Sequence, residues 1–241
     1  MAAVSSGNSE NLVPQHIGFI MDGNRRWAKE RGLPTLEGHR RGLYDALIPL
    51  VDNCSKKGVK YITVWAFSTD NWNRPKPEIN YLIDLMGQVF RDKLDELDEK
   101  GVRINPIGRL TDYPIKTQKL AQEAKDRTAH NDKFVFNIGL SYGGRDEIVT
   151  ATRNIIRDGL KPEEVTEAKF SEYIFEAGQP NPDIICRTSG EQRLSGFLLW
   201  QSTYSELYFT DTYWPDFDKE QLRIALLDYA ARDRRFGKLS S

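Results

Sequence analysis

Apolar and polar positions alternate along the chain in blocks that predict strands and helices in turn. Short runs rich in β-branched and aromatic residues predict buried strands, and longer segments with apolar residues three and four positions apart predict helices with one buried face. Strands are expected at 16–21, 61–67, 102–107, 134–140, 183–186 and 206–209. Helices are expected from 24 to about 32, and at 38–57, 78–100, 113–131, 146–157, 168–177 and 219–232.

This alternation predicts the α/β fold class: a single domain with a mainly parallel six-stranded sheet flanked by helices. No internal repeat or linker divides the chain, so one domain is expected over 15–237, between tails at 1–14 and 238–241. The G-x-G-x-x-G fingerprint and the G-x-x-x-x-G-K-[ST] phosphate loop are both absent, which argues against a Rossmann or P-loop fold.

Composition narrows the class of protein. The formal net charge of −1 provides no basic field, so no nucleic-acid partner is expected. No signal peptide precedes the domain, and no apolar run approaches the roughly 18 residues of a membrane span. Cys54 and Cys186 have no neighbour at metal-ligand spacing, so both are expected to be buried thiols in a reducing compartment. A cytoplasmic protein is therefore predicted.

Polar clusters follow four of the expected strands, at 22–27, 68–74, 142–145 and 187–195. The carboxyl ends of parallel strands lie at one edge of a sheet, so these clusters should converge on one cleft. Arginine forks match phosphate oxygens, and an aspartate in the same place suits Mg²⁺. Several arginines with Asp22 therefore predict a site for Mg²⁺ and two phosphates.

Each of these residues also has a plainer explanation. Asp22 could equally be the N-cap of the helix that starts at Asn24. His39 could be a surface residue at a helix start, and Asn71 could only shape its loop. Glu206 lies in an apolar stretch, where a carboxylate is either paired or functional.

The helices beside the predicted cleft carry wide apolar stripes. Most of these residues are expected to form ordinary core. A phosphate site beside an apolar tunnel would nevertheless suit an isoprenoid diphosphate, whose head is charged and whose tail is a hydrocarbon.

Long motifs then identify a family resemblance that covers about residues 15–237. They are H-I-G-F-I-M-D-G-N-R-R-W-A at 16–28, G-H at 38–39, F-S-T-D-N-W-N-R-P at 67–75, Y-G-G-R at 142–145, R-T-S-G-E-Q-R-L-S at 187–195 running on to 201, and W-P-D-F at 214–217. In this order the motifs closely resemble the cis-prenyltransferases, the undecaprenyl diphosphate synthase family.

The resemblance implies condensation of isopentenyl diphosphate with an allylic diphosphate such as farnesyl diphosphate. The product would be a cis-polyprenyl diphosphate, the precursor of a glycan-carrier lipid. Asp22 and Asn71 would be catalytic, and Asp22 and Glu206 would be the Mg²⁺ ligands. The implied substrate-binding residues are Gly23, Asn24, Arg25, Arg26, Trp27, His39, Ser68, Thr69, Asp70, Trp72, Arg74, Arg187, Arg193, Leu194 and Ser195.

The family resemblance also implies a homodimer in which Arg235–Gly237 closes over the partner's site, with transient membrane contact when product leaves. Four positions depart from the common bacterial pattern: Arg25, Thr35, Asp70 and Gly196. Thr35 stands where many members carry an arginine that touches diphosphate, so that role is not carried over.

Product length is left open by the sequence. Gly196 and the stretch 179–183 look similar to short-chain members, and Phe134 and Phe136 would narrow a tunnel floor. Ala66 followed by Phe67 looks like the long-chain type. The alternatives to a long-chain synthase are a short-chain Z-prenyl diphosphate synthase and a non-catalytic partner subunit. Such subunits have lost the diphosphate motifs that this chain keeps.

Overall fold

The structure is a computed structural model that describes residues 13–234. The expectations for 1–12, for 235–241 and for the motif at Arg235–Gly237 lie outside the described residues. Within them, the predicted fold class is confirmed: six strands form one sheet, and every pair of neighbouring strands is parallel.

The sheet has the strand order β3-β4-β2-β1-β5-β6. The strands are β1 (His16–Ile20), β2 (Tyr61–Ser68), β3 (Val102–Ile107), β4 (Phe134–Tyr142), β5 (Ile184–Arg187) and β6 (Glu206–Phe209). All five residues of the central strand β1 are buried. This is the burial expected of a strand that is paired on both sides and covered on both faces, and it explains the unbroken apolar run in the sequence.

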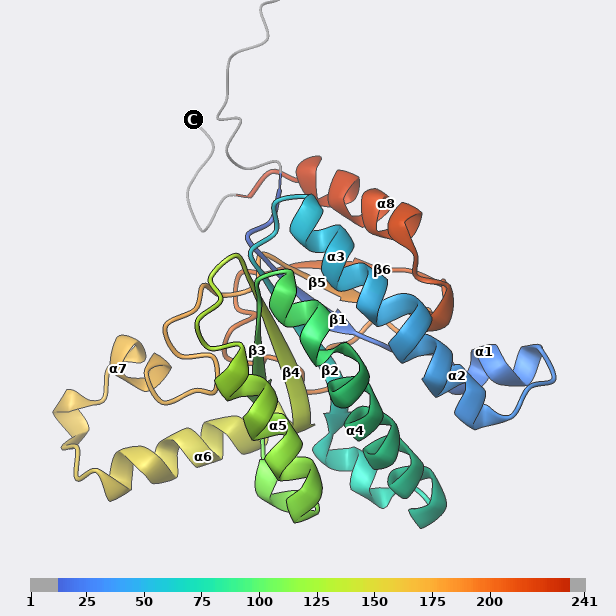
Figure 1. The fold of residues 1–241 in the computed structure, drawn as a ribbon. Helices are drawn as coiled ribbons and strands as arrows, with labels where there is room; N and C mark the ends of the chain where they lie inside the picture. The colour runs from blue at the N-terminus through green and yellow to red at the C-terminus, as the bar shows by residue number, and fades with distance from the viewer. Residues whose placement is uncertain (1–12, 235–241) are drawn as a thin grey trace, which may run out of the picture.

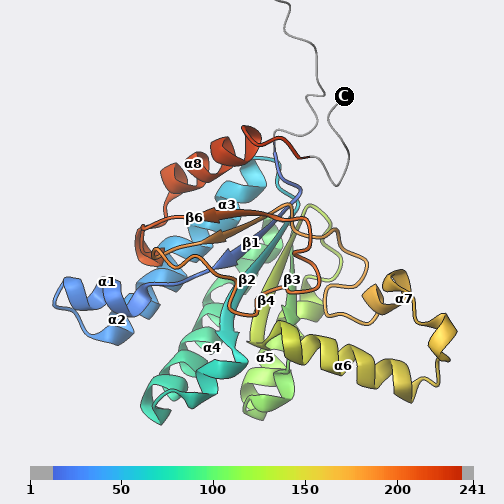
Figure 2. The same ribbon diagram turned by 180° about the vertical axis from the view of Figure 1, so that it is seen from behind.

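Helices cover both faces of the sheet. They are α1 (Asn24–Glu30), α2 (Thr35–Arg41), α3 (Ile48–Lys56), α4 (Lys76–Glu99), α5 (Ile115–Arg127), α6 (Gly144–Arg157), α7 (Glu167–Ser171) and α8 (Lys219–Ala230). Figure 1 shows α3, α4 and α5 in front of the sheet, with α8 beside α3. From behind, α6 and the chain between β5 and β6 lie on the viewer's side (Figure 2).

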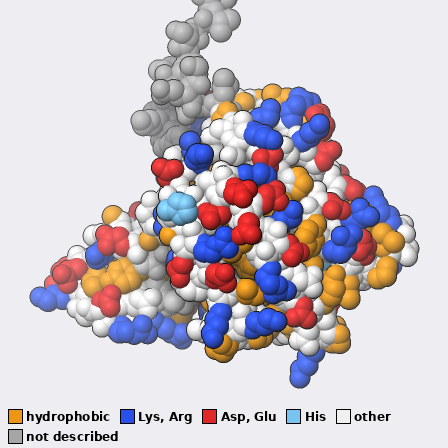
Figure 3. All heavy atoms as spheres, in the orientation of Figure 1, with side chains coloured by type: hydrophobic (Ala, Val, Ile, Leu, Met, Phe, Trp, Pro, Cys, Tyr) orange, Lys and Arg blue, Asp and Glu red, His pale blue; other side chains and the backbone are white. Residues whose placement is uncertain are grey.

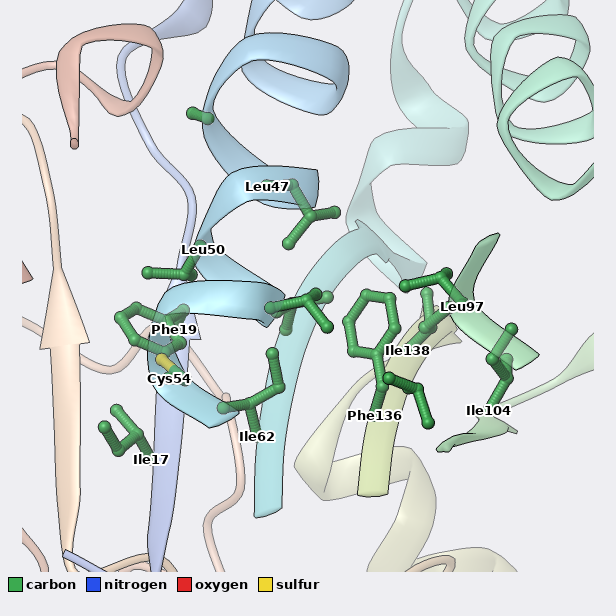
Figure 4. Packing of buried hydrophobic residues seen from close by; sticks show 14 of the residues in the cluster. Ile17, Phe19, Leu47, Leu50, Cys54, Ile62, Leu97, Ile104, Phe136 and Ile138 are labelled. Atoms are coloured by element: carbon green, nitrogen blue, oxygen red, sulfur yellow. The ribbon is translucent and has the colours of Figure 1, made fainter. Parts of the chain in front are cut away.

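The main core lies between the sheet and the helices on the α3–α4 face. Leu50 and Cys54 of α3 point toward Phe19 of β1, while Leu47 lies toward the ring of Phe136 on β4 (Figure 4). Cys54 and Cys186 are both buried, as predicted. Burial raises the pKa of each thiol, so these cysteines act as apolar filler.

Two helix predictions are corrected by the structure. The helix expected at 38–57 begins at Thr35 and is interrupted by a π-helical segment, Gly42–Leu47. Pro49, two residues after this segment ends, has no N–H, so the preceding turn lacks one of its hydrogen bonds and can widen. The helix expected at 168–177 ends at Ser171, because Ile174 and Glu176 turn inward and are buried.

Lysine, arginine and acidic side chains are interspersed over the face shown in Figure 3. Among residues 13–234, no helix is both long and apolar enough to cross a membrane.

Candidate functional site

Asp22 lies just beyond the carboxyl end of β1 and is held from three sides. Its Oδ2 accepts a hydrogen bond from Arg187 Nη2 at 2.9 Å, and its Oδ1 accepts one from the Gly23 N–H at 2.7 Å. The Thr188 hydroxyl accepts from the Asp22 N–H at 2.9 Å and donates to the Asp22 carbonyl at 2.7 Å. The ends of β1 and β5 are therefore joined around one carboxylate.

The helix-cap alternative for Asp22 is not supported. The N-cap of α1 is Gly23, in the left-handed region at φ +101°, and no side chain caps that helix. A Cβ on Gly23 would lie 2.6 Å from Tyr213 Cδ1 and 2.8 Å from Ser189 Oγ, so only glycine fits this turn. The Asp22 carboxylate is thus left facing the β5 loop rather than the helix.

The loop after β5 brings more charge to the same place. Arg187 is 5 % exposed and donates from Nη1 to Ser195 Oγ at 2.9 Å and to the Arg193 carbonyl. Arg26 Nη1 donates to the Ser189 carbonyl at 3.2 Å, and its Nη2 lies 3.5 Å from Asp22 Oδ1. Arg193 pairs with Glu191. Two of the predicted arginines, Arg187 and Arg26, therefore contact Asp22, and Arg193 adjoins them through its carbonyl.

A polar pocket opens beside this cluster, between α1, the π-helical segment and the start of α4. It holds about 580 Å³ of empty space. Its lining includes Asn24, His39, Asn71, Arg74 and Trp65. Asn24 Oδ1 and His39 Nε2 are buried and have no hydrogen-bond partner within the described residues, as expected of groups that await a ligand.

Glu78 balances the positive charge at the wall of this pocket. Its carboxylate accepts from Arg74 Nη1 at 3.2 Å and lies 3.5 Å from His39 Nε2 and 3.8 Å from Arg25 Nη1. Burial, with the Arg74 charge adding to it, lowers the pKa of His39 to about 4, although Glu78 opposes the shift. His39 is therefore a neutral imidazole at pH 7 and can donate one N–H to an anion.

An apolar cavity lies next to the polar pocket. It holds about 490 Å³ of empty space and is lined by side chains of α3, α4 and the sheet, among them Val89, Phe90, Leu97 and Phe136. Leu43, Ala66 and Met86 line both spaces. From Met86 to Leu97, α4 runs along the cavity for about 16 Å at its rise per residue. An apolar cavity of the kind expected for a tunnel therefore lies beside the polar pocket.

The turn after β2 places Asn71 in the lining of the polar pocket. Residues Thr69–Asn73 form a 3₁₀ turn capped reciprocally: the Asn71 N–H donates to Ser68 Oγ at 3.2 Å, and Asn71 Oδ1 accepts from the Ser68 N–H at 3.1 Å. Because this bond orients the amide oxygen toward the backbone, Asn71 is held as a fixed donor. It is poorly arranged to take up a proton.

Several predicted residues lie apart from the polar pocket. Thr69 and Asp70 line a separate hollow beyond Trp65, together with Ser195. Leu194 packs against a small core cluster on the α6 face. Trp27 is buried and donates to Asp216 Oδ1 at 2.7 Å, which indicates a structural role.

Glu206 is not brought together with Asp22 within the chain. It opens β6 and is in register with Ile184, at the amino end of β5, whereas Asp22 follows the carboxyl end of β1. Its carboxylate accepts from Arg232 Nη1 at 2.8 Å. The expectation that Asp22 and Glu206 share a metal ion is therefore not met by a single copy of the chain.

Sequence reasoning missed residues that support the site. Thr188 holds the Asp22 backbone, and Glu78 holds Arg74. Glu78 had a detectable signal, because it follows Arg74 by four residues at a helix start, where such a pair meets. Thr188 had none, since its role depends on the pairing of β1 with β5.

The site chemistry suits a hard cation that shares its ligands with a phosphate. Over residues 13–234, no group of three or more His, Cys, Asp or Glu side chains could hold a metal. Mg²⁺ is commonly bound by one or two carboxylates together with substrate phosphates and water. Asp22, with arginines around it, fits that pattern.

The fold and site are those expected of a prenyltransferase: an anion-binding cleft at the carboxyl edge of a parallel sheet, beside an apolar cavity. Comparison with known proteins agrees. The profile of the family described as "Putative undecaprenyl diphosphate synthase" matches residues 20–237. The chain belongs to this family.

Similar proteins extend over nearly the whole chain. An isoprenyl transferase of Clostridium perfringens is 46 % identical over 95 % of this chain and 91 % of its own. A ditrans,polycis-undecaprenyl-diphosphate synthase of Micrococcus luteus, named as (2E,6E)-farnesyl-diphosphate specific, is 45 % identical over 94 % of this chain and 92 % of its own. The solved lavandulyl diphosphate synthase of Lavandula x intermedia, in complex with dimethylallyl diphosphate, superposes with a TM-score of 0.91 at 34 % identity, over 95 % of this chain and all of that one.

Proposed function

We propose that this prenyltransferase condenses isopentenyl diphosphate with an allylic diphosphate such as farnesyl diphosphate. The product is a long cis-polyprenyl diphosphate, the precursor of a glycan-carrier lipid. The observation that supports the proposal is that a polar pocket and an apolar cavity lie side by side, because Leu43, Ala66 and Met86 line both. A ligand with a charged head and a hydrocarbon tail matches this change in lining.

The allylic diphosphate is assigned to the polar pocket. Asn24, His39 and Arg74 line it, and Arg26, on the same helix as Asn24, lies 3.5 Å from Asp22. The isopentenyl diphosphate is assigned to Arg187, Arg193 and Ser195, which lie on the other side of Asp22. In this arrangement Asp22 lies between the two heads, where negative charge develops as the allylic carbon–oxygen bond breaks.

The remaining steps follow from the chemistry of the substrates. The double bond of isopentenyl diphosphate attacks the allylic carbon as its bond to diphosphate breaks, and the new chain then loses a proton to the released diphosphate. Asn71, fixed through Ser68, positions the reacting ends and is not the base. The surrounding apolar side chains exclude water from the allylic cation.

Mg²⁺ is the proposed cofactor, with Asp22 as the residue of this chain that would hold it. When bound, the ion would neutralise charge on the departing diphosphate. A homodimer, a cytoplasmic location and transient membrane contact during product release are further parts of the proposal. Within one copy, Glu206 is paired with Arg232. In such a dimer, Glu206 would therefore reach a metal only across copies.

The two alternatives are less well supported. Curated relatives named as farnesyl-specific undecaprenyl synthases favour a long product over a short one. A non-catalytic subunit would not need the set of arginines that surrounds Asp22.

A pyrophosphate-release assay on the purified chain tests the proposal. Release is expected only when both isopentenyl and farnesyl diphosphate are present with Mg²⁺, and it should stop when EDTA is added. Release from either substrate alone, or equal release in EDTA, would contradict the proposed reaction.

A further inference from the structure

The 69–73 turn, which carries Asn71, rests on the end of β4. Trp72 Nε1 donates to Ser141 Oγ at 2.9 Å, and the Trp72 ring packs against Phe67 and Tyr113 at centroid distances of 5.0 and 5.3 Å. At the other end of the turn, a Cβ on Gly143 would come 2.8 Å from Thr69 Oγ1. The turn therefore lies close against the end of β4, and the Trp72–Ser141 hydrogen bond ties the two together.

Ser141 has an unusual conformation for a residue with a side chain. It is fully buried, and its φ of +48° lies in the left-handed region, which L-residues other than Asn, Asp and Gly adopt at a cost. Serine is retained at this cost, which indicates that the hydroxyl does something that glycine could not do there.

The hydroxyl of Ser141 joins a donor to an acceptor. It accepts from the Trp72 indole and donates to Asp112 Oδ2 at 2.5 Å. Asp112 is held in turn by Arg109 Nε at 3.1 Å, and Arg109 Nη1 donates to Asp146 Oδ1 at 3.2 Å. Only a group that both accepts and donates can complete this chain of bonds. Serine, threonine and asparagine are the small residues that can, and the β-branched threonine is disfavoured at a positive φ.

The backbone is shaped to bring these partners together. The Arg109 N–H donates to the Ser141 carbonyl at 3.3 Å. Gly108, at φ +105°, allows this approach, because a Cβ there would lie 2.2 Å from the Leu140 carbonyl oxygen. The exits of β3 and β4 thus form one rigid support beneath the 69–73 turn.

We propose that Ser141 is a positioning residue that fixes the 69–73 turn through Trp72, and so holds Asn71 in the lining of the polar pocket. The expected effect on kcat rests on the proposed condensation, whereas the fixing of the 69–73 turn by Ser141 does not depend on it. Loss of the hydroxyl should loosen the turn and slow the chemical step while leaving the diphosphate-binding arginines in place.

The test compares S141G, W72F and the double variant with the wild-type chain. Glycine suits the left-handed backbone, so S141G removes the hydroxyl without adding strain. W72F removes the indole N–H and keeps an aromatic ring. We expect each single variant to raise hydrogen–deuterium exchange in the peptide covering 68–75 and to lower kcat about tenfold, the order expected for one lost hydrogen bond, with KM within about twofold. The double variant should be no worse than the singles, since both act on one bond.

Two further variants separate positioning from general stability. S141N should restore exchange and kcat toward wild type, because asparagine tolerates positive φ and can both accept and donate. S171A is the matched control, because Ser171 Oγ also accepts from a tryptophan, Trp200 Nε1, at 3.0 Å, but on α7. It should change neither exchange at 68–75 nor kcat.

Two results would overturn the inference even if the wild-type chain condenses its substrates. One is unchanged hydrogen–deuterium exchange at 68–75 in S141G. The other is a double variant whose loss of kcat is the product of the losses in S141G and W72F. Failure of the wild-type chain to condense them would overturn the proposed function instead, and the exchange data would still decide whether Ser141 holds the turn. If S141G lowers the melting temperature strongly, W72F measured alone decides, since increased exchange supports the inference and unchanged exchange rejects it.

Discussion

Arg187 donates to Asp22 across 2.9 Å, and the arginine is 5 % exposed while its partner is about one third exposed. This ion pair joins the exits of β1 and β5, which neighbour each other in the sheet. The carboxylate is open enough to meet a ligand, whereas the guanidinium is fixed behind it.

Replacing Asp22 should separate its chemical role from its structural one. D22N keeps an acceptor for Arg187 but removes the charge, so kcat should fall at least about 100-fold with little change in melting temperature. D22A also leaves a buried guanidinium without its partner and should lower the free energy of unfolding by about 1–3 kcal/mol. Steady-state kinetics and thermal melts measure both effects.

The matched control for Asp22 is D158N, since Asp158 accepts from the Tyr173 hydroxyl on the α6–α7 side of the molecule. It should leave kcat near wild type. If D22N or D22A retains near-normal Mg²⁺-dependent turnover, the assignment of the metal to Asp22 is wrong.

The apolar cavity should set the length of the product. Val89 lies on α4 between Met86, which also lines the polar pocket, and Leu97 further along, so V89W would place an indole across the cavity. The first condensations should still occur, and the average product should be shorter. Chromatographic sizing of labelled products measures this.

V165W serves as the comparison for V89W, because Val165 is 40 % exposed and does not line the cavity. Its products should match those of the wild-type chain. A normal product distribution from a folded V89W would show that the growing chain does not occupy this cavity.

Stability should depend on pH through a buried network behind the sheet. The Thr63 hydroxyl lies between His16 Nε2, at 2.8 Å, and the Glu176 carboxyl. Burial lowers the pKa of His16 from 6.5 to about 4. Burial, with Glu147 adding to it, raises the pKa of Glu176 from 4.5 to about 8.

The pKa shifts of His16 and Glu176 change stability with pH in opposite directions. Below pH 6.5 the unfolded chain protonates His16 and the folded protein does not, so the His16 contribution to stability is lost as pH falls toward 4. Above pH 4.5 the folded protein keeps a proton on Glu176 that the unfolded chain releases, so the Glu176 contribution is lost as pH rises toward 8. From pH 6.5 to 8 the His16 shift no longer contributes, and the Glu176 shift alone should lower stability by up to about 1.4 kcal/mol per pH unit.

E176Q should abolish the loss of stability between pH 6.5 and 8, as measured by urea unfolding at these two pH values. E172Q, at an exposed carboxylate that pairs with Lys169, should keep it. The same fall with pH in E176Q and the wild-type chain would exclude Glu176 as its source.

The sequence predicts the fold and the position of the cleft well, because both depend on local pattern. Strand-forming runs alternate with amphipathic segments, and the polar clusters after four strands meet at one edge because the strands are parallel. The apolar stripe of α4 likewise becomes the wall of the cavity.

Details that depend on tertiary contacts could not be predicted. Glu206, expected at the metal from the family resemblance, begins β6, so within one copy of the chain it lies at the sheet edge opposite Asp22. Trp27 belongs to a motif at the site, yet its indole is directed to Asp216, which is 189 residues away in sequence. The support that Ser141 gives Trp72 depends on a left-handed backbone that no local pattern reveals.

The most direct test of the central claim is the carbon number of the product formed from labelled isopentenyl diphosphate and farnesyl diphosphate by the purified chain with Mg²⁺. A head site beside a long apolar cavity predicts repeated condensation and a long polyprenyl diphosphate with cis double bonds. A single condensation product, or no product, would contradict this account.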